Sequence, residues 1–384
     1  MEWINVLLAY ILFWTIIYLV YKGLGIKKES IVVRPFFLMI KTTLLNNWIK
    51  RLASVKKKIV TNILNIGIIV GLSQMAFIIY FLLRNLDLLF QRAEQATGFV
   101  LLIPGLTISW DTLPYIIIVL FITLATHELA HGIAALIDNV PLKSAGIFLA
   151  VVMPGGFVEI DEDILNKSKI MTKLRVFAAG SFANITVWAL IMILLTNFAL
   201  TISPLYDSES SGVLITGLVE NGPAQLEGLE NGDVIYALNG TKITDVDALR
   251  NFMLNITSNP YILADTSAGI VGIQTQPHPT QSNMSQIGVY PFNYHEPKFN
   301  WASSSFPYHL YLFEFWASII LLWIALFNMI PLYPMDGDRF LYSILERILP
   351  KHSKMLRISI SIFSLILLGS NFLISTLTFG LVRI

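Results

Sequence analysis

Residues 114–137, PYIIIVLFITLATHELAHGIAALI, combine a continuous apolar run with an H-E-x-x-H motif at His127, Glu128 and His131. The run is long enough to cross the hydrocarbon core of a bilayer as one helix. Helical positions four apart share a face, so both imidazoles can reach one metal ion while Glu128 points toward its open position. Ionisable side chains at membrane depth are costly and usually functional. The stretch therefore predicts a membrane-embedded metal site with a poised carboxylate.

Composition indicates that most of the chain lies in lipid. The 384 residues are 55% hydrophobic and only 13% charged, whereas soluble domains usually contain about 25% charged residues. The formal net charge of +1 gives no general attraction to nucleic acid, and no nucleic-acid partner is expected. The chain has no cysteine, which excludes disulfides and thiolate ligands. Any metal must therefore be held by His, Asp, Glu or backbone oxygens.

Apolar segments of spanning length define the expected architecture. Six occur, at residues 3–21, 60–83, 114–137, 174–200, 311–331 and 358–382. The first has an acidic N-terminal flank and lacks a small-residue cleavage site, which favours a retained helix over a cleaved signal peptide. The sequence predicts an α-helical polytopic membrane protein with about six transmembrane helices.

Loop charges predict the orientation of these helices. Residues 22–58 contain ten Lys or Arg and one acid, and residues 339–357 add five more basic residues. Residues 206–300 contain ten acids and three bases. Basic loops tend to stay in the cytoplasm, so the first two regions are expected there and the acidic region outside. Counting alternating spans gives the same sides for a multi-pass protein of the cell membrane.

Two further apolar stretches are interrupted and are not expected to span. Residues 98–108 contain a Pro-Gly pair, and residues 145–160 contain Pro154-Gly155-Gly156. Irregular backbone at membrane depth is tolerated only where it is buried in protein or lines a wet cavity. We expect both stretches to be re-entrant or surface-lying segments, the alternative being an amphipathic surface loop.

A catalytic zinc site needs a third protein ligand and leaves a fourth position for water. The best candidate is Asp336, which follows the fifth span after two prolines stop its helix. The third and fifth spans run in the same direction, so His131 and Asp336 approach the same, cytoplasmic leaflet. Asp338 is a rival ligand, although we expect a solvated loop acid beside Arg339. Without a metal, the histidines would be satisfied by interhelical hydrogen bonds.

The pairing of two motifs carries a family resemblance. H-E-x-x-H is followed by N-x-x-P-x-x-P-x-D-G at residues 328–337. The chain resembles the site-2 proteases, which are zinc intramembrane proteases, and specifically their microbial members with a PDZ domain between the two catalytic helices. The resemblance implies one zinc ion bound by His127, His131 and Asp336. It also implies that Glu128 is the general base.

Softer matches imply residues that bind substrate. Gly180 to Asn184 resembles the family's G-P-x-x-N segment, with Ser181 at the usual proline. Asn184 and Asn328 are expected to contact substrate near the zinc. The alternatives are helix packing for Asn184 and capping of the broken helix end for Asn328.

A transmembrane helix hides its carbonyls in hydrogen bonds, so a substrate must unwind locally before cleavage. The broken segment around Gly155 and Gly156 is a plausible edge on which the extended substrate can pair. The alternative is that the two glycines only make a turn.

The acidic region has the pattern of a separate domain. Asn239-Gly240 is a strong hairpin signal, and residues 245–254 resemble a helix that begins at an acidic cap. The spacing resembles PDZ domains of bacterial membrane proteases, so an inserted α+β PDZ domain is expected. Such domains bind peptides by strand addition, and in this family they are thought to screen out substrates with bulky exterior portions.

The expected function is zinc-dependent endopeptidase cleavage of transmembrane segments of membrane-tethered substrates, after another protease has trimmed their exterior part. The alternatives are a non-catalytic membrane adaptor that binds peptides through its PDZ domain and a metal transporter, which should offer ligands at several depths. The expected divisions are residues 1–58 with the first helix and basic loop, 59–205 with the first part of the catalytic core, 206–300 with the PDZ domain, and 301–384 with the second part of the core.

Overall fold

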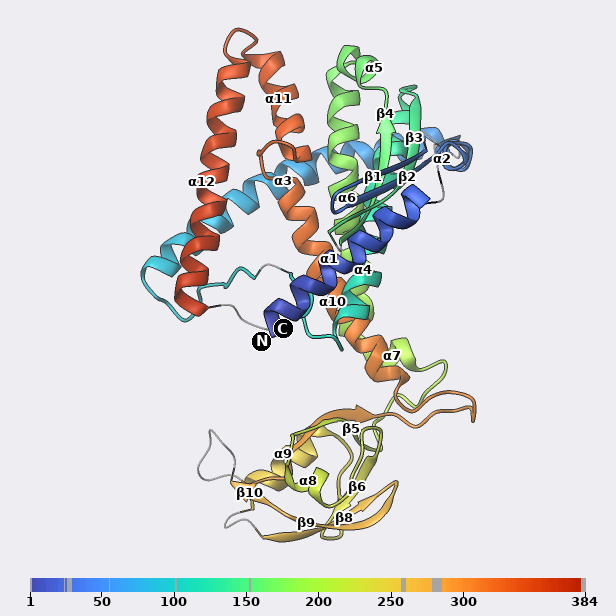
Figure 1. Ribbon diagram of the computed structural model, residues 1–384, viewed down its shortest axis with the longest axis vertical. Helices are drawn as coiled ribbons and strands as arrows, with labels where there is room; N and C mark the ends of the chain where they lie inside the picture. Colours follow the sequence, from blue (N-terminus) through green and yellow to red (C-terminus); the bar gives the residue numbers. More distant parts are fainter. Residues whose placement is uncertain are drawn as a thin grey trace. The chain divides into compact units, whose positions relative to one another are not determined.

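The computed structural model describes residues 2–23, 25, 30–54, 56–100, 102–151, 153–256, 260–277 and 285–380 (Figure 1). The chain divides into two compact units. Unit 1 consists of Met1–Leu190 and Trp316–Ile384, and unit 2 consists of Ile191–Phe315. Val382, the expected end of the last span, lies outside the described residues.

Unit 1 is built from long helices and one small sheet. Its elements in chain order are α1 (Glu2–Gly23), β1 (Ile31–Arg34), β2 (Phe37–Thr42), α2 (Leu44–Ser54), α3 (Lys57–Phe90), α4 (Leu113–Ile137), β3 (Leu142–Ala150), β4 (Met153–Ile160), α5 (Glu162–Lys167), α11 (Asp336–Ile348) and α12 (Ser353–Phe379). Two more helices, α6 (Ile170–Thr196) and α10 (Phe306–Asn328), contribute residues to both units.

Five helices of the described chain are long and apolar enough to cross a membrane. They are α3, α4, α6, α10 and α12. The helix α1 is apolar over the shorter stretch Leu8–Gly23. Continuous apolar sequence, rather than one hydrophobic stripe, is the pattern of helices surrounded by lipid. The predicted class, an α-helical multi-pass membrane protein, is confirmed.

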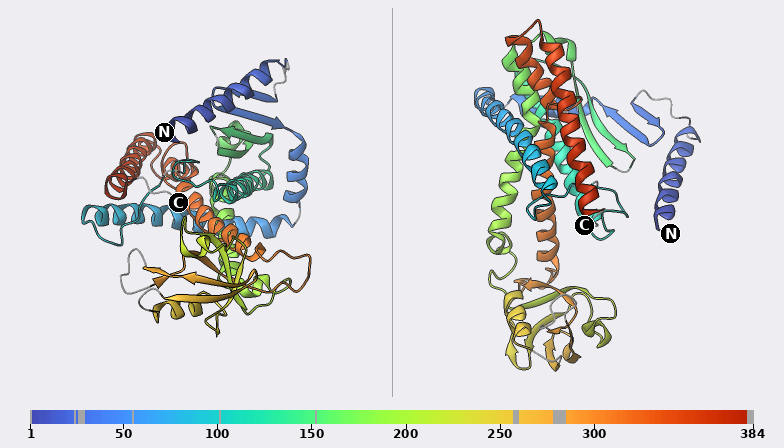
Figure 2. Two further views of the ribbon diagram at one scale, coloured as in Figure 1. Left: turned by 60° about the horizontal axis from the view of Figure 1, so that its bottom comes forward. Right: turned by 90° about the vertical axis from the view of Figure 1, so that its left-hand side faces the viewer.

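The sheet of unit 1 positions a free strand edge next to α4. Its strands are antiparallel in the order β1-β2-β3-β4, and β4, at one end, packs along α4 (Figure 2). Gly155 pairs with Phe148 and Gly156 with Ile147, so both glycines lie inside the ladder. The alternative that they make a turn is wrong, because both are paired residues within β4.

In their described residues, neither of the two interrupted apolar stretches forms a spanning helix, as expected. Residues 145–160 form most of the β3–β4 hairpin. Among residues 98–100 and 102–108, an isolated bridge joins Pro104 to Ile108.

Close packing and buried amides hold the helices of unit 1 together. Gly132 lies where an added Cβ would come within 3.2 Å of Val158 and 3.4 Å of Ile49, so α4 can approach both β4 and α2. Asn85 of α3 donates to Asn371 of α12 over 3.0 Å, and both side chains are buried. Such interhelical amide bonds satisfy polar groups that lipid cannot.

Unit 2 is an α+β domain. It contains α7 (Phe198–Ile202), β5 (Gly212–Leu218), α8 (Pro223–Leu226), β6 (Val234–Leu238), β7 (Thr241–Lys242), α9 (Val246–Leu254), β8 (Tyr261–Thr266), β9 (Gly269–Gln274), β10 (Gln276–Pro277), β11 (Ser285–Gln286) and β12 (Val289–Tyr294). The main sheet has the order β12-β5-β6-β8-β9, with β7 paired to β6. The β10–β11 pair is separate, and α9 packs on β5 and β12.

The local signals of unit 2 are confirmed. Asn239 and Gly240 have φ values of 47° and 79° and join β6 to β7, as a hairpin turn with two positive-φ residues requires. The helix α9 begins after Asp245, whose carboxylate accepts from the backbone N–H of Ala248 over 2.7 Å.

Candidate metal centre

The helix α4 presents two buried imidazoles on one face. His127 and His131 are four residues apart, and their side chains are 5% and 9% exposed. Their ring centroids lie 4.7 Å apart. Helical spacing alone brings two ring nitrogens toward one point, as the motif predicts.

Asp336 reaches this point because α11 starts directly against the end of α10. Asp336 is the first residue of α11. A Cβ on the next residue, Gly337, would lie 2.3 Å from the carbonyl oxygen of Met329. Glycine is therefore the residue that allows this close approach.

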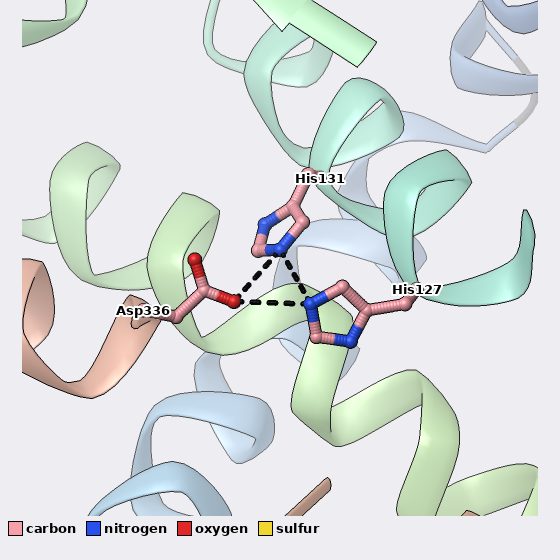
Figure 3. Close-up of side chains that lie close together, drawn as sticks. All are labelled: His127, His131 and Asp336. Atoms are coloured by element: carbon pink, nitrogen blue, oxygen red, sulfur yellow. Dashed lines mark hydrogen bonds and ion pairs between the residues drawn. The ribbon is translucent and has the colours of Figure 1, made fainter. Parts of the chain in front are cut away.

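The three side chains converge on one position (Figure 3). The Nε2 atoms of His127 and His131 each lie 3.0 Å from Oδ2 of Asp336, and 3.1 Å from one another. Ligands bound tetrahedrally at 2.0–2.1 Å lie about 3.3 Å apart, so these ligand atoms need to move apart by only a few tenths of an ångström to form a zinc site. Two imidazoles and one carboxylate are also a donor set that zinc accepts, with a fourth position left for water.

Glu128 is oriented by the free edge of β4. Its Oε2 accepts from the backbone N–H of Val158 over 3.0 Å. An added Cβ on Gly156 would lie 3.8 Å from Cγ of Glu128, so this part of the strand passes close beside the carboxylate. The candidate base and the candidate substrate edge are therefore in contact.

A cavity of about 640 Å³ opens onto the three converging side chains. Glu128 and Asn328 line it, the latter as the last residue of α10. Charged residues at the lining include Lys143, Glu159, Glu162 and Arg339. The hydrogen bond from Ser144 (2.6 Å) and the charge of Lys41 hold the pKa of the Glu159 carboxyl below its usual value. Glu159 therefore keeps its negative charge at neutral pH.

Asn184 lies against the other ring nitrogen of His127. Its Nδ2 is 3.2 Å from Nδ1 of His127, and its side chain is fully buried. The carbonyl oxygen of Val176 takes the corresponding place for His131, 2.6 Å from Nδ1. Sequence reasoning missed this carbonyl and the N–H of Val158, because a backbone group has no side-chain signature.

The expectation for Asp338 is wrong. Its side chain is only 2% exposed and forms an ion pair with Arg357 of α12. Arg339, the expected neighbour, instead pairs with Glu162 at 3.1 Å. Asp338 therefore joins α11 to α12 instead of facing solvent.

The profile of peptidase family M50 matches residues 115–369. This match covers more than half of the chain and includes every residue of the candidate centre. The chain belongs to peptidase family M50. The predictions of a site-2 protease relative and of a peptidase are thereby confirmed.

Three relatives of the peptidase differ in how much they share with it. A membrane-bound transcription factor site-2 protease homolog from Arabidopsis thaliana is 29% identical over 140 residues, which are 36% of this chain and 27% of that one. An uncharacterized protein from Methanocaldococcus jannaschii is 28% identical over 341 residues, 86% of this chain and 83% of that one. A Clostridium perfringens protein with the provisional name of a zinc metalloprotease is 27% identical over 191 residues, 42% of this chain and 53% of that one. The match thus spans about a quarter of the plant relative and half of the clostridial one.

Two of the solved structures that match the chain are PDZ domains of SdrC-like proteins. The one from Listeria monocytogenes has a TM-score of 0.20 and 15% identity, and covers 21% of this chain and 87% of that one. The one from Listeria innocua has a TM-score of 0.19 and 17% identity, and covers 22% and 98%. PDZ is the domain type expected at residues 206–300.

Proposed function

We propose that this peptidase cleaves transmembrane segments of membrane-tethered proteins, with one zinc ion bound by His127, His131 and Asp336. The observation that carries the proposal is the convergence of these three side chains, from two helices more than two hundred residues apart in sequence, within 3.1 Å of one another. The cofactor is zinc, which this donor set and spacing fit.

The chemistry proposed for the centre is general-base hydrolysis. Zinc held by His127, His131 and Asp336 would supply Lewis-acid activation of a water molecule. Glu128 follows His127 directly and lines the same cavity, so its carboxylate can accept the proton of that water while the water oxygen bonds to the carbonyl carbon of the peptide. The same carboxyl then returns the proton to the leaving amine when the peptide bond breaks.

The free edge of β4 is the proposed binding site for the unwound substrate. An extended chain can add to an exposed strand edge through main-chain hydrogen bonds. Gly156 leaves room beside Glu128 because it carries no side chain, whereas the corresponding space at Gly155 is taken by the ring of Phe148. Asn328, which lines the cavity, can donate its amide to a substrate carbonyl or to the developing oxyanion.

The membrane placement is proposed from the loop charges. Residues 22–58 and 339–357 are basic and belong on the cytoplasmic side, which puts the metal centre toward the cytoplasmic leaflet. The acidic unit 2 then lies outside the cell. There it would bind a peptide or exclude substrates whose exterior part has not been trimmed by another protease.

The test is cleavage of a single-span substrate by the purified chain in detergent, with zinc content measured in parallel. Glu128→Gln should retain zinc and lose cleavage by at least about 100-fold, because general-base catalysis contributes this much or more. Glu162→Gln is the matched control, since Glu162 lines the same cavity and pairs with the partly exposed Arg339. It should keep zinc and most of the activity.

Two outcomes would contradict the proposal. If the native chain and both variants hold zinc and none cuts a panel of transmembrane helices, a non-catalytic adaptor fits better. If the native chain does not bind zinc, the ligand assignment fails.

A further inference from the structure

One face of α6 lies under both histidines of the metal centre. Val176, Gly180 and Asn184 are four residues apart, so they share this face. Val176 contacts His131, and Asn184 contacts His127. The earlier residue on α6 contacts the later histidine on α4, and the later residue on α6 contacts the earlier histidine. This is the order of contacts that two antiparallel helices make.

Gly180 makes this contact possible. A Cβ at this position would lie 2.5 Å from Nε2 of both His127 and His131. Any side chain here would occupy the space where the ring nitrogens converge. The glycine therefore allows α6 to pack directly against the two histidines of the metal centre.

The ring of His131 is oriented by a group that can only accept. Its Nδ1 lies 2.6 Å from the carbonyl oxygen of Val176, so Nδ1 must carry the proton of this hydrogen bond. Nε2 is then the nitrogen with a free lone pair, and it is the nitrogen that faces Asp336.

His127 needs the same arrangement if its Nε2 is to bind metal. Nδ1 then carries the proton, and the neighbouring Asn184 must present its oxygen rather than its amino group. The two ends of an amide occupy nearly the same space, so its orientation follows from the hydrogen-bond network.

Thr126 completes that network. Its Oγ1 lies 3.2 Å from the other end of the Asn184 amide and 2.9 Å from the carbonyl oxygen of Ile122. The hydroxyl can donate to Ile122 while it accepts from the amino group of Asn184. Every polar atom of the chain His127–Asn184–Thr126 then has a partner of the right kind.

We propose that α6 is the orienting element of the metal centre and that Asn184 is a positioning residue, which accepts a hydrogen bond from Nδ1 of His127. The inference rests on the proposed zinc ligands and deepens that function. It reassigns Asn184 from substrate binding to ligand orientation. Groups that orient ligating histidines typically change metal affinity by about 10- to 100-fold when removed.

The test is the zinc affinity of the full-length chain, measured by competition with a chromogenic chelator. Asn184→Leu removes the acceptor and should weaken zinc binding by about 10- to 100-fold. Asn184→Asp keeps an acceptor oxygen and should bind zinc about as tightly as the native chain. Helical content and thermal unfolding of the zinc-free proteins, recorded alongside, show whether each variant folds.

Thr186→Val is the matched control on the same helix. Thr186 is exposed, and its hydroxyl donates to the carbonyl of Phe182 within α6. This variant should keep native zinc affinity. Native affinity in Asn184→Leu together with weaker substrate binding would overturn the proposal and return Asn184 to the substrate. Lack of zinc binding by the native chain would instead overturn the proposed function itself.

Discussion

The carboxylate of Glu128 accepts a hydrogen bond from the backbone N–H of Val158 over 3.0 Å. This bond joins α4, which carries the metal-binding motif, to the strand edge on which an unwound substrate can pair. A protonated carboxyl is a weaker acceptor than a carboxylate. When Glu128 takes up a proton during catalysis, its hydrogen bond to the N–H of Val158 in β4 is therefore expected to weaken.

Val158→Pro should show how much the hydrogen bond between Val158 and Glu128 contributes to catalysis, apart from the strand β4 itself. Proline removes the N–H and fixes φ, and at an edge strand it is tolerated where the N–H makes no ladder bond. We expect zinc content to stay native while the cleavage rate falls about 10-fold, the scale of one lost hydrogen bond to a charged group. Single-turnover cleavage with zinc analysis measures both. Val158→Ala, which keeps the N–H, should cleave normally, and equal losses in the two variants would refute this role.

The sequence was sufficient to find the residues whose spacing carries the chemistry. His127, His131 and Asp336 were identified because a helical repeat and a helix-breaking Pro-x-x-Pro segment limit where their side chains can go. The positions of backbone groups depend on packing between elements, so the carbonyl of Val176 was not predictable. The prediction that Asp338 is a solvated loop acid was wrong because its partner, Arg357, lies on a different helix, and the packing of two helices is not visible in the sequence.

Gly155 and Gly156 should respond differently to the same substitution. A Cβ on Gly155 would lie 2.2 Å from the ring of Phe148, which stacks on Phe37, so Gly155→Ala should destabilise the hairpin by about 1–3 kcal/mol. On Gly156 the nearest atom would be 3.8 Å away, so Gly156→Ala should fold normally. Thermal unfolding in detergent provides the measurement. Phe148→Ala combined with Gly155→Ala should recover stability, and failure to do so would show that another contact is responsible.

Asp338 and Asp336 occupy the same turn of α11, but substituting them should have different effects, one on stability and the other on zinc binding. Asp338→Asn weakens a buried ion pair to Arg357, whose side chain is 31% exposed, and should lower the free energy of unfolding by about 1–3 kcal/mol. Zinc at saturating concentration should still bind. Asp336→Asn should instead lose zinc with little change in the stability of the zinc-free chain. A double-mutant cycle with Arg357→Met isolates the pair, and additive effects of the two substitutions would argue against it.

The cap of α9 predicts a pH dependence confined to unit 2. The N–H of Ala248 (2.7 Å) and the hydroxyl of Thr244 (2.9 Å) donate to Asp245 and hold the pKa of its carboxyl below the usual value. A lowered pKa in the folded state means that this stabilisation is complete at neutral pH. It is lost as the pH falls below about 4, where the unfolded carboxyl becomes protonated. Hydrogen exchange of the α9 amides in the full chain, corrected for intrinsic rates, should therefore show loss of protection in acid.

Two substitutions separate the charge of Asp245 from its capping bond. Asp245→Ala should lower the stability of α9 by about 1 kcal/mol at neutral pH, the usual effect of losing an N-cap. Asp245→Asn keeps a side-chain oxygen and is a good N-cap, so protection at neutral pH should be close to native. Because an amide does not titrate, the acid-induced loss in α9 should be smaller in this variant than in the native chain. An identical loss in both would place the titrating group elsewhere in unit 2.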